Sequence, residues 1–202
     1  MADTDRAPTR LLAIALLVTV ASQLFYITVV SSAGPETVLR PITWLTELFA
    51  FLSTALAAFT LAVRRPDQAA LWVALAVAGI FNVMQVAIGL SMFGPASDGE
   101  PQLMATVLAG AFFLYFLAKV LMAGAGIVLG LIAARGTTTV TKVLGGLTVL
   151  AGLAGAVLNF FAMIDPKAWM FGAGASGTAV TAFLAVVLLL DNSASRGVPT
   201  SA

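Results

Sequence analysis

The feature that most constrains this chain is a lysine inside an apolar, helix-length stretch, residues 102–135. The stretch contains the run LAGAFFLYFLAKVLMAGAGIVLGLIAAR, in which Lys119 is the only charged residue before Arg135. Its length and composition predict a helix that spans a membrane. A charge at mid-membrane depth is costly and usually faces the interior of a helix bundle, beside a polar partner. The sequence therefore raises the question of which residue pairs with Lys119.

The composition indicates that the solvent of the whole chain is lipid. Hydrophobic residues make up 60% of the 202 residues and charged residues 9%, whereas soluble domains carry about 25% charged residues. Cysteine and histidine are absent, which excludes disulfides, imidazole metal ligands and the usual general base. We therefore expect no metal site and no cofactor, and a net charge of +1 predicts no nucleic-acid partner.

Six apolar runs of spanning length alternate with turns rich in glycine, proline and charge. They predict an all-α integral membrane fold, a six-helix bundle formed by one domain over residues 10–190. The expected spans are residues 11–32, 42–63, 69–93, 103–134, 140–164 and 168–190. The first run has the length of a full span and no convincing cleavage site, so we interpret it as a helix rather than a signal peptide. Residues 1–9 are expected to be a polar tail and residues 191–202 a disordered tail.

The basic residues predict the orientation of the bundle. With six spans both termini lie on one side, and this side carries seven basic residues against two on the other, so the positive-inside rule places both termini in the cytoplasm. The tryptophans Trp44 and Trp169 would then mark the outer interface, and Trp72 the inner one. The seven are Arg6, Arg10, Arg64, Arg65, Arg135, Lys142 and Arg196, and the two are Arg40 and Lys167.

Counting residues from these basic anchors predicts a buried polar layer. Glu47 lies 17 residues from Arg64 and Lys119 lies 16 from Arg135, which places both roughly 24 to 26 Å above the anchors at about 1.5 Å per residue. We therefore predict a buried Glu47–Lys119 ion pair. The same count places further polar residues at or within one turn of this level, and we predict that they line a ligand site with the pair: Tyr26, Asn82, Gln85 and Asn159.

The polar residues share helix faces with small residues. Side chains three and four positions apart align on a helix, and small residues let membrane helices approach closely, so these faces should point into the bundle. The four predicted inward faces are Thr43, Glu47, Ala50 and Thr54; Ala78, Asn82, Gln85 and Gly89; Tyr115, Lys119, Ala123, Gly126 and Gly130; and Gly145, Thr148, Gly152, Gly155 and Asn159.

Two of the expected helices carry glycine-patterned strings that indicate a family resemblance. The strings are YFLAKVLMAGAGIVLGLIAARG and TKVLGGLTVLAGLAGAVLNF, with a looser echo in ELFAFLSTALAAFTL. With this patterning, residues 110–165 resemble an uncharacterised family of small bacterial multi-pass membrane proteins, defined only as a domain of unknown function. The resemblance implies a bacterial inner-membrane protein and assigns no role to any residue.

Three functions remain open at this point. The first is a transporter or binding protein that holds a small polar or zwitterionic ligand between Glu47 and Lys119. The second is a non-catalytic accessory or assembly subunit, in which the charges set the register of the helices and a glycine face contacts a partner subunit or a second copy of the chain. The third, disfavoured because carboxylates are few, is a membrane enzyme that acts on a lipid-like or isoprenoid substrate. A cavity that reaches the two charges would favour the first, and a filled bundle the second.

Overall fold

The computed structural model describes residues 3–34 and 37–194, and this part of the chain consists of helices and their connections. Its six helices, with the short turns that flank them, are each long and apolar enough to cross a membrane. The predicted six-helix fold is therefore confirmed. The helices are α1 (Asp3–Thr28), α2 (Leu39–Arg64), α3 (Ala69–Ser97), α4 (Pro101–Ala134), α5 (Thr139–Ile164) and α6 (Pro166–Ala194), with 3₁₀ turns at Val30–Ser32 and Pro66–Gln68.

Local signals explain where several helices begin. Proline is the first residue of α4 and of α6, a position at which its missing N–H and fixed φ cost nothing. Thr138 caps α5 by accepting a hydrogen bond from the Thr141 amide at 3.2 Å, and Asp165 accepts one from the Ala168 amide at the start of α6. These short polar side chains satisfy backbone donors that have no partner within the helix.

The two outer helices extend beyond the predicted spans. Helix α1 begins at Asp3 and includes most of the segment that was expected to be a polar tail. Helix α6 continues to Ala194, so residues 191–194 are helical rather than disordered. The rest of the predicted C-terminal tail, residues 195–202, lies outside the described residues.

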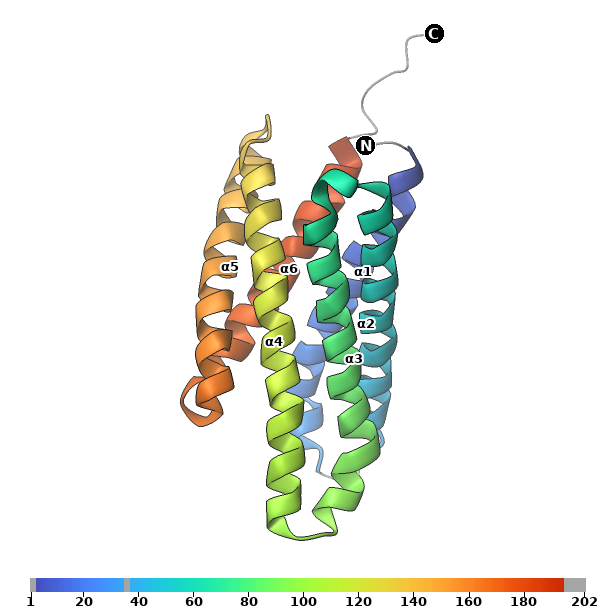
Figure 1. The fold of residues 1–202 in the computed structure, drawn as a ribbon, viewed down its shortest axis with the longest axis vertical. Helices are drawn as coiled ribbons and strands as arrows, with labels where there is room; N and C mark the ends of the chain where they lie inside the picture. The colour runs from blue at the N-terminus through green and yellow to red at the C-terminus, as the bar shows by residue number, and fades with distance from the viewer. Residues whose placement is uncertain (1–2, 35–36, 195–202) are drawn as a thin grey trace.

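Five of the helices form a closed bundle, and the sixth packs outside it. Helices α1, α2, α3, α4 and α6 contact one another in this order, and α6 also contacts α1 (Figure 1). We call this group the five-helix bundle. Helix α5 packs against α4 and α6 on the outside. The start of α1, the end of α6 and the α2–α3 and α4–α5 connections lie at one end of the molecule, which we call the terminal end.

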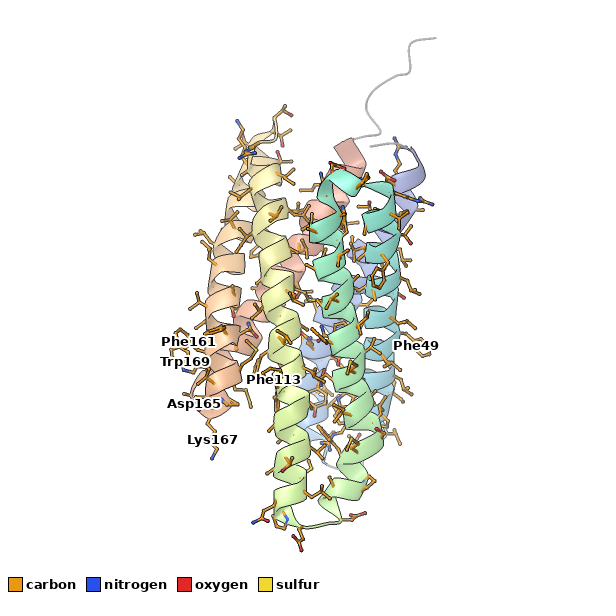
Figure 2. The ribbon with its side chains drawn as sticks, in the orientation of Figure 1. Phe49, Phe113, Phe161, Asp165, Lys167 and Trp169 are labelled. Atoms are coloured by element: carbon orange, nitrogen blue, oxygen red, sulfur yellow. The ribbon has the colours of Figure 1, made fainter. Side chains whose placement is uncertain are left out.

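The main apolar core lies inside the five-helix bundle and contains no residue of α5. It includes Leu16 of α1, Phe51 of α2, Leu75 of α3, Met122 of α4 and Leu184 of α6. Large apolar side chains also cover the outside, and Figure 2 shows some of them projecting from the helices. Among the labelled side chains, Phe49, Phe113, Phe161 and Trp169 are all exposed. An apolar exterior of this kind suits a lipid environment, because lipid chains are as apolar as leucine.

Trp72 corrects one prediction about the membrane interface. Its side chain is 0% exposed and belongs to the main core, and the Arg65 guanidinium lies 5.5 Å from the centre of its indole. Trp72 therefore does not lie on the outer surface of the protein, where the residues of an aromatic belt contact the membrane interface. Its place near the terminal end was inferred correctly, but its face of α3 points into the protein.

The small-residue faces point inward, as predicted from their spacing. On α5 the buried residues are the five predicted ones and Ala162, and Thr43, Glu47, Ala50 and Thr54 of α2 are buried too. The closest approach is between α5 and α4, where a Cβ atom at Gly145 would lie 2.6 Å from the Gly130 carbonyl oxygen. Glycine at this position is what lets the two backbones touch.

Candidate functional site

Lys119 is wholly buried between α4 and α6. Its side chain is 0% exposed, and its ammonium donates a hydrogen bond of 3.4 Å to the Thr181 hydroxyl of α6. The ammonium also lies 5.3 Å from the centre of the Tyr115 aromatic ring, one turn earlier on α4. An ammonium has three donors, and a single long hydrogen bond with one aromatic contact satisfies them only in part.

Gly177 makes room for the aliphatic part of this lysine. A Cβ atom at Gly177 would lie 3.0 Å from Cδ and 3.1 Å from Cγ of Lys119. Gly177 and Thr181 are four residues apart, so they share one face of α6. Lys119 packs against this face. The glycine admits the stem of the side chain, and the threonine receives its charged end.

Glu47 lies on α2, across the five-helix bundle from α6. Its side chain is 9% exposed and has the Ser22 hydroxyl of α1 as its hydrogen-bonding neighbour. The same hydroxyl lies 3.4 Å from the Thr43 carbonyl oxygen, the second acceptor within reach of its single hydrogen. Two helices thus surround the carboxylate with polar atoms, on the side of the bundle away from Thr181.

The predicted direct ion pair between Glu47 and Lys119 is not formed. The two charges attract each other, but the ion pair seen among the described side chains joins the Asp5 carboxylate to the Arg65 guanidinium instead. The reason is the packing order, because α2 and α4 each pack against α3 rather than against each other. Two residues at equal depth on α2 and α4 therefore face each other across the bundle without touching.

The other predicted site residues have contacts of their own in the described structure. Tyr26 stacks on Trp44, with 6.3 Å between the ring centres, and Gln85 is half-buried on α3. Asn82 donates to the Ala78 carbonyl of its own helix at 3.0 Å. None of the described hydrogen bonds of these residues reaches Lys119 or Glu47.

Asn159 joins α5 to α6 instead of joining the polar layer. Its amide donates to the Gly155 carbonyl at 2.8 Å and to the Ala173 carbonyl of α6 at 3.1 Å. Because α5 packs outside the five-helix bundle, a side chain at the right depth on α5 meets α6 rather than the bundle interior. The count of residues gave its depth but could not give its direction.

Two buried acceptors near this level have no partner in the described structure. They are the side-chain oxygens of Asn82 and Asn159, each in a residue that is 0% exposed. Buried polar atoms are nearly always hydrogen-bonded, and exceptions are commonly explained by bound water, an ion or a functional role. Together with the incompletely satisfied ammonium, they make this level of the molecule rich in polar groups that still have capacity to bind.

Four residues near this level were not among the six predicted site residues, although Tyr115 was expected on the inward face of Lys119. Ser22, Tyr115 and Thr181 surround the two charges, and Gln23 accepts a hydrogen bond of 3.0 Å from Thr178, which ties α1 to α6. The sequence did contain a signal for Tyr115, since it lies one turn from Lys119 on the same face of α4. A serine or threonine in a membrane helix is too common to single out, because its hydroxyl usually bonds to the backbone of its own helix.

None of the six predicted site residues lines the cavities described in the structure. One, of about 390 Å³, is at the terminal end between α3, α4 and α6, and another of similar volume lies on the outer surface between α1 and α2. No family model, curated protein or solved structure matches this chain. The resemblance of residues 110–165 to a bacterial family therefore stays an expectation.

Proposed function

We propose that the chain is an integral membrane protein that crosses the bacterial inner membrane six times, with both termini in the cytoplasm. The six apolar helices and the apolar exterior support insertion. The basic residues support the orientation, because those adjoining the α2–α3 and α4–α5 connections, Arg64, Arg65, Arg135 and Lys142, gather at the terminal end. Positively charged loops remain in the cytoplasm during insertion.

Reporter fusions test this topology. A reporter fused at the C-terminus, and one inserted between Arg64 and Asp67, should both report the cytoplasm. A reporter inserted between Asp98 and Glu100, in the connection between α3 and α4, should report the opposite side. A periplasmic signal from either of the first two fusions would contradict the proposed orientation.

Within this topology we propose that the protein binds a small polar or zwitterionic ligand at Lys119 and Glu47, and that it acts as a transporter of this ligand. The observation that carries the proposal is the state of Lys119, a fully buried cation whose protein contacts are one long hydrogen bond and one aromatic ring. Intramembrane ionisable residues are expensive and usually mark the path of a substrate or ion.

The separation of the two charges suggests how such a ligand binds. Because Glu47 and Lys119 attract each other without contact, a small zwitterion can lie between them, with its carboxylate at Lys119 and its ammonium at Glu47. The Tyr115 ring and the Thr181 hydroxyl would then border the ligand, and charge-assisted hydrogen bonds would replace the incomplete contacts of the ammonium.

Ligand binding can be measured with a panel of zwitterionic amino acids, such as glycine, alanine and glutamine. We expect at least one of them to raise the Tm of the purified protein in detergent, and Lys119→Met to abolish the increase. Lys142→Met is the matched control, because Lys142 is an exposed lysine at the terminal end of α5. Binding that is unchanged in Lys119→Met, or the absence of any Tm increase across the panel, would contradict the proposal.

The second candidate is a non-catalytic membrane subunit in which the two charges only fix helix positions. The close fit of the Lys119 stem against Gly177 supports it, and neither charge lines a described cavity. In this case Lys119→Met should leave every measurable activity intact and affect only stability or assembly.

A further inference from the structure

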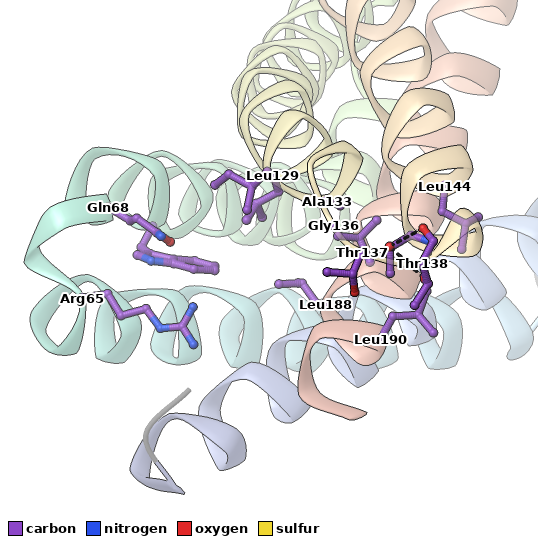
Figure 3. A pocket seen from close by; sticks show the side chains of 14 residues that line it. Arg65, Gln68, Leu129, Ala133, Gly136, Thr137, Thr138, Leu144, Leu188 and Leu190 are labelled. Carbon is purple, nitrogen blue, oxygen red and sulfur yellow. Dashed lines mark hydrogen bonds between the residues drawn. The ribbon is translucent and has the colours of Figure 1, made fainter. Parts of the chain in front are cut away.

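The terminal-end cavity carries polar groups that the polar layer does not involve. Its walls come from the α2–α3 turn, the end of α4 with the start of α5, and the last turns of α6 (Figure 3). Its volume of about 390 Å³ falls within the range of about 300 to 1,000 Å³ typical of small-molecule pockets. Neither Glu47 nor Lys119 lines it.

Two residues that line this cavity carry a buried hydrogen-bond donor with no acceptor in the described structure. One is the indole N–H of Trp72, in a side chain that is 0% exposed. The other is the Nη2 group of Arg65, whose side chain is 15% exposed. The two belong together, because the guanidinium lies 5.5 Å from the centre of the indole.

The Arg65 guanidinium is oriented by one ion pair, and one of its other donors has no acceptor in the described structure. Its Nε donates to a carboxylate oxygen of Asp5 at 3.1 Å, which orients the guanidinium, while Nη2 remains available. Gln68, one turn before Trp72, also lines the cavity and adds an amide to the same wall. Both unpaired groups only donate, so a complementary ligand must supply acceptors, and beside a guanidinium the favoured acceptor is an anionic oxygen.

The opposite wall is apolar. Leu129 of α4 and Val187 and Leu188 of α6 line it, and Figure 3 shows Leu129 and Leu188 on either side of the space next to Gly136. The hydroxyls of Thr138 and Thr141 at this wall are already engaged with each other and with the backbone at the start of α5. A ligand that satisfies the donors therefore also meets hydrocarbon.

We propose that this cavity binds an acidic amphiphile, with a phosphate held by Trp72 and Arg65 and an apolar chain against Leu129, Val187 and Leu188. Basic pockets between membrane helices on the cytoplasmic side bind acidic lipid head groups, and a lipid of the adjoining leaflet has this chemistry. The choice of a lipid rests on the proposed membrane insertion, which the reporter fusions test separately. It does not depend on the ligand proposed at Lys119.

The test uses the purified full-length protein in neutral detergent and short-chain lipids as probes. Dihexanoyl phosphatidylglycerol should raise the Tm in a saturable manner. Trp72→Phe, which keeps an aromatic ring and removes the N–H, and Arg65→Gln should each weaken the apparent affinity about ten-fold or more, since each removes a hydrogen bond to a charged group. Trp169→Phe removes an equivalent N–H from an exposed tryptophan away from the cavity and should change nothing.

Three other outcomes would overturn the proposal. Inorganic phosphate that gives the same stabilisation at the same concentration would show a site for a free anion rather than for an amphiphile. Dihexanoyl phosphatidylcholine that binds as well as phosphatidylglycerol would show that negative charge is not recognised. Unchanged affinity in Arg65→Gln would exclude the guanidinium, and this variant decides the question even if Trp72→Phe fails to fold.

Discussion

Gly145→Ala is expected to lower the free energy of unfolding by about 1 to 3 kcal/mol, while Gly146→Ala should leave it unchanged or raise it. The added methyl group at Gly145 would meet backbone atoms of α4, with the Gly130 carbonyl oxygen at 2.6 Å. Backbone atoms cannot rotate away, so α4 and α5 must separate. At Gly146 an added Cβ has no neighbour within 4 Å, and alanine is the better helix former by about 0.8 to 1 kcal/mol.

Thermal unfolding of the purified variants in detergent measures this difference. Adjacent positions on one helix make a matched pair, since both changes add the same methyl group. The glycines on the inward face of α5 also predict an order of destabilisation. A Cβ at Gly152 would lie 2.7 Å from the Ile127 side chain, whereas at Gly155 the nearest atom is 3.4 Å away. Gly155→Ala should therefore be the mildest of the three buried changes, and equal Tm values for Gly145→Ala and Gly146→Ala would contradict the packing of α5 on α4.

A second large loss of unfolding free energy is expected from Glu47→Gln, which leaves Lys119 buried without the negative charge that attracts it. Two unit charges somewhat beyond contact distance interact by about 2 kcal/mol at an effective dielectric constant of about 20, so a loss of stability of about this size is expected. Adding Lys119→Met should recover most of it, since an apolar side chain of similar length replaces the uncompensated cation. Lys119→Met alone should cost less than Glu47→Gln, because the Glu47 side chain is 9% exposed and keeps Ser22 as a neighbour, whereas Lys119 is 0% exposed.

A double-mutant cycle on unfolding free energies measures this coupling. Glu100→Gln is the control, because this carboxylate is exposed at the start of α4 and its removal should change stability little. Losses that simply add in the Glu47→Gln/Lys119→Met variant would show that the two charges do not interact. A coupling of about 3 to 5 kcal/mol, as for a buried pair in direct contact, would contradict the separation seen in the structure.

The helices and their buried faces were readable from the sequence because both follow from local periodicity. Runs of spanning length and the turns between them gave six helices, and a spacing of three and four residues identified the inward face of α5 residue by residue. The errors of the prediction lie at the ends: α1 and α6 continue into polar segments, since helix geometry does not require an apolar sequence once the helix leaves lipid.

The partners of Lys119 were decided only by the tertiary structure. Depth along a helix is a single coordinate, and residues on any two helices can share it without meeting. In the packing order, α2 and α4 are neighbours of α3 rather than of each other, and α5 lies outside the five-helix bundle. Lys119 therefore contacts Gly177 and Thr181 of α6, and Asn159 bonds to the backbone of α6. The sequence alone determined that a lysine and a glutamate are buried at one level; which side chains they touch depended on the order in which the helices pack, because that order is set by contacts between residues far apart in the chain.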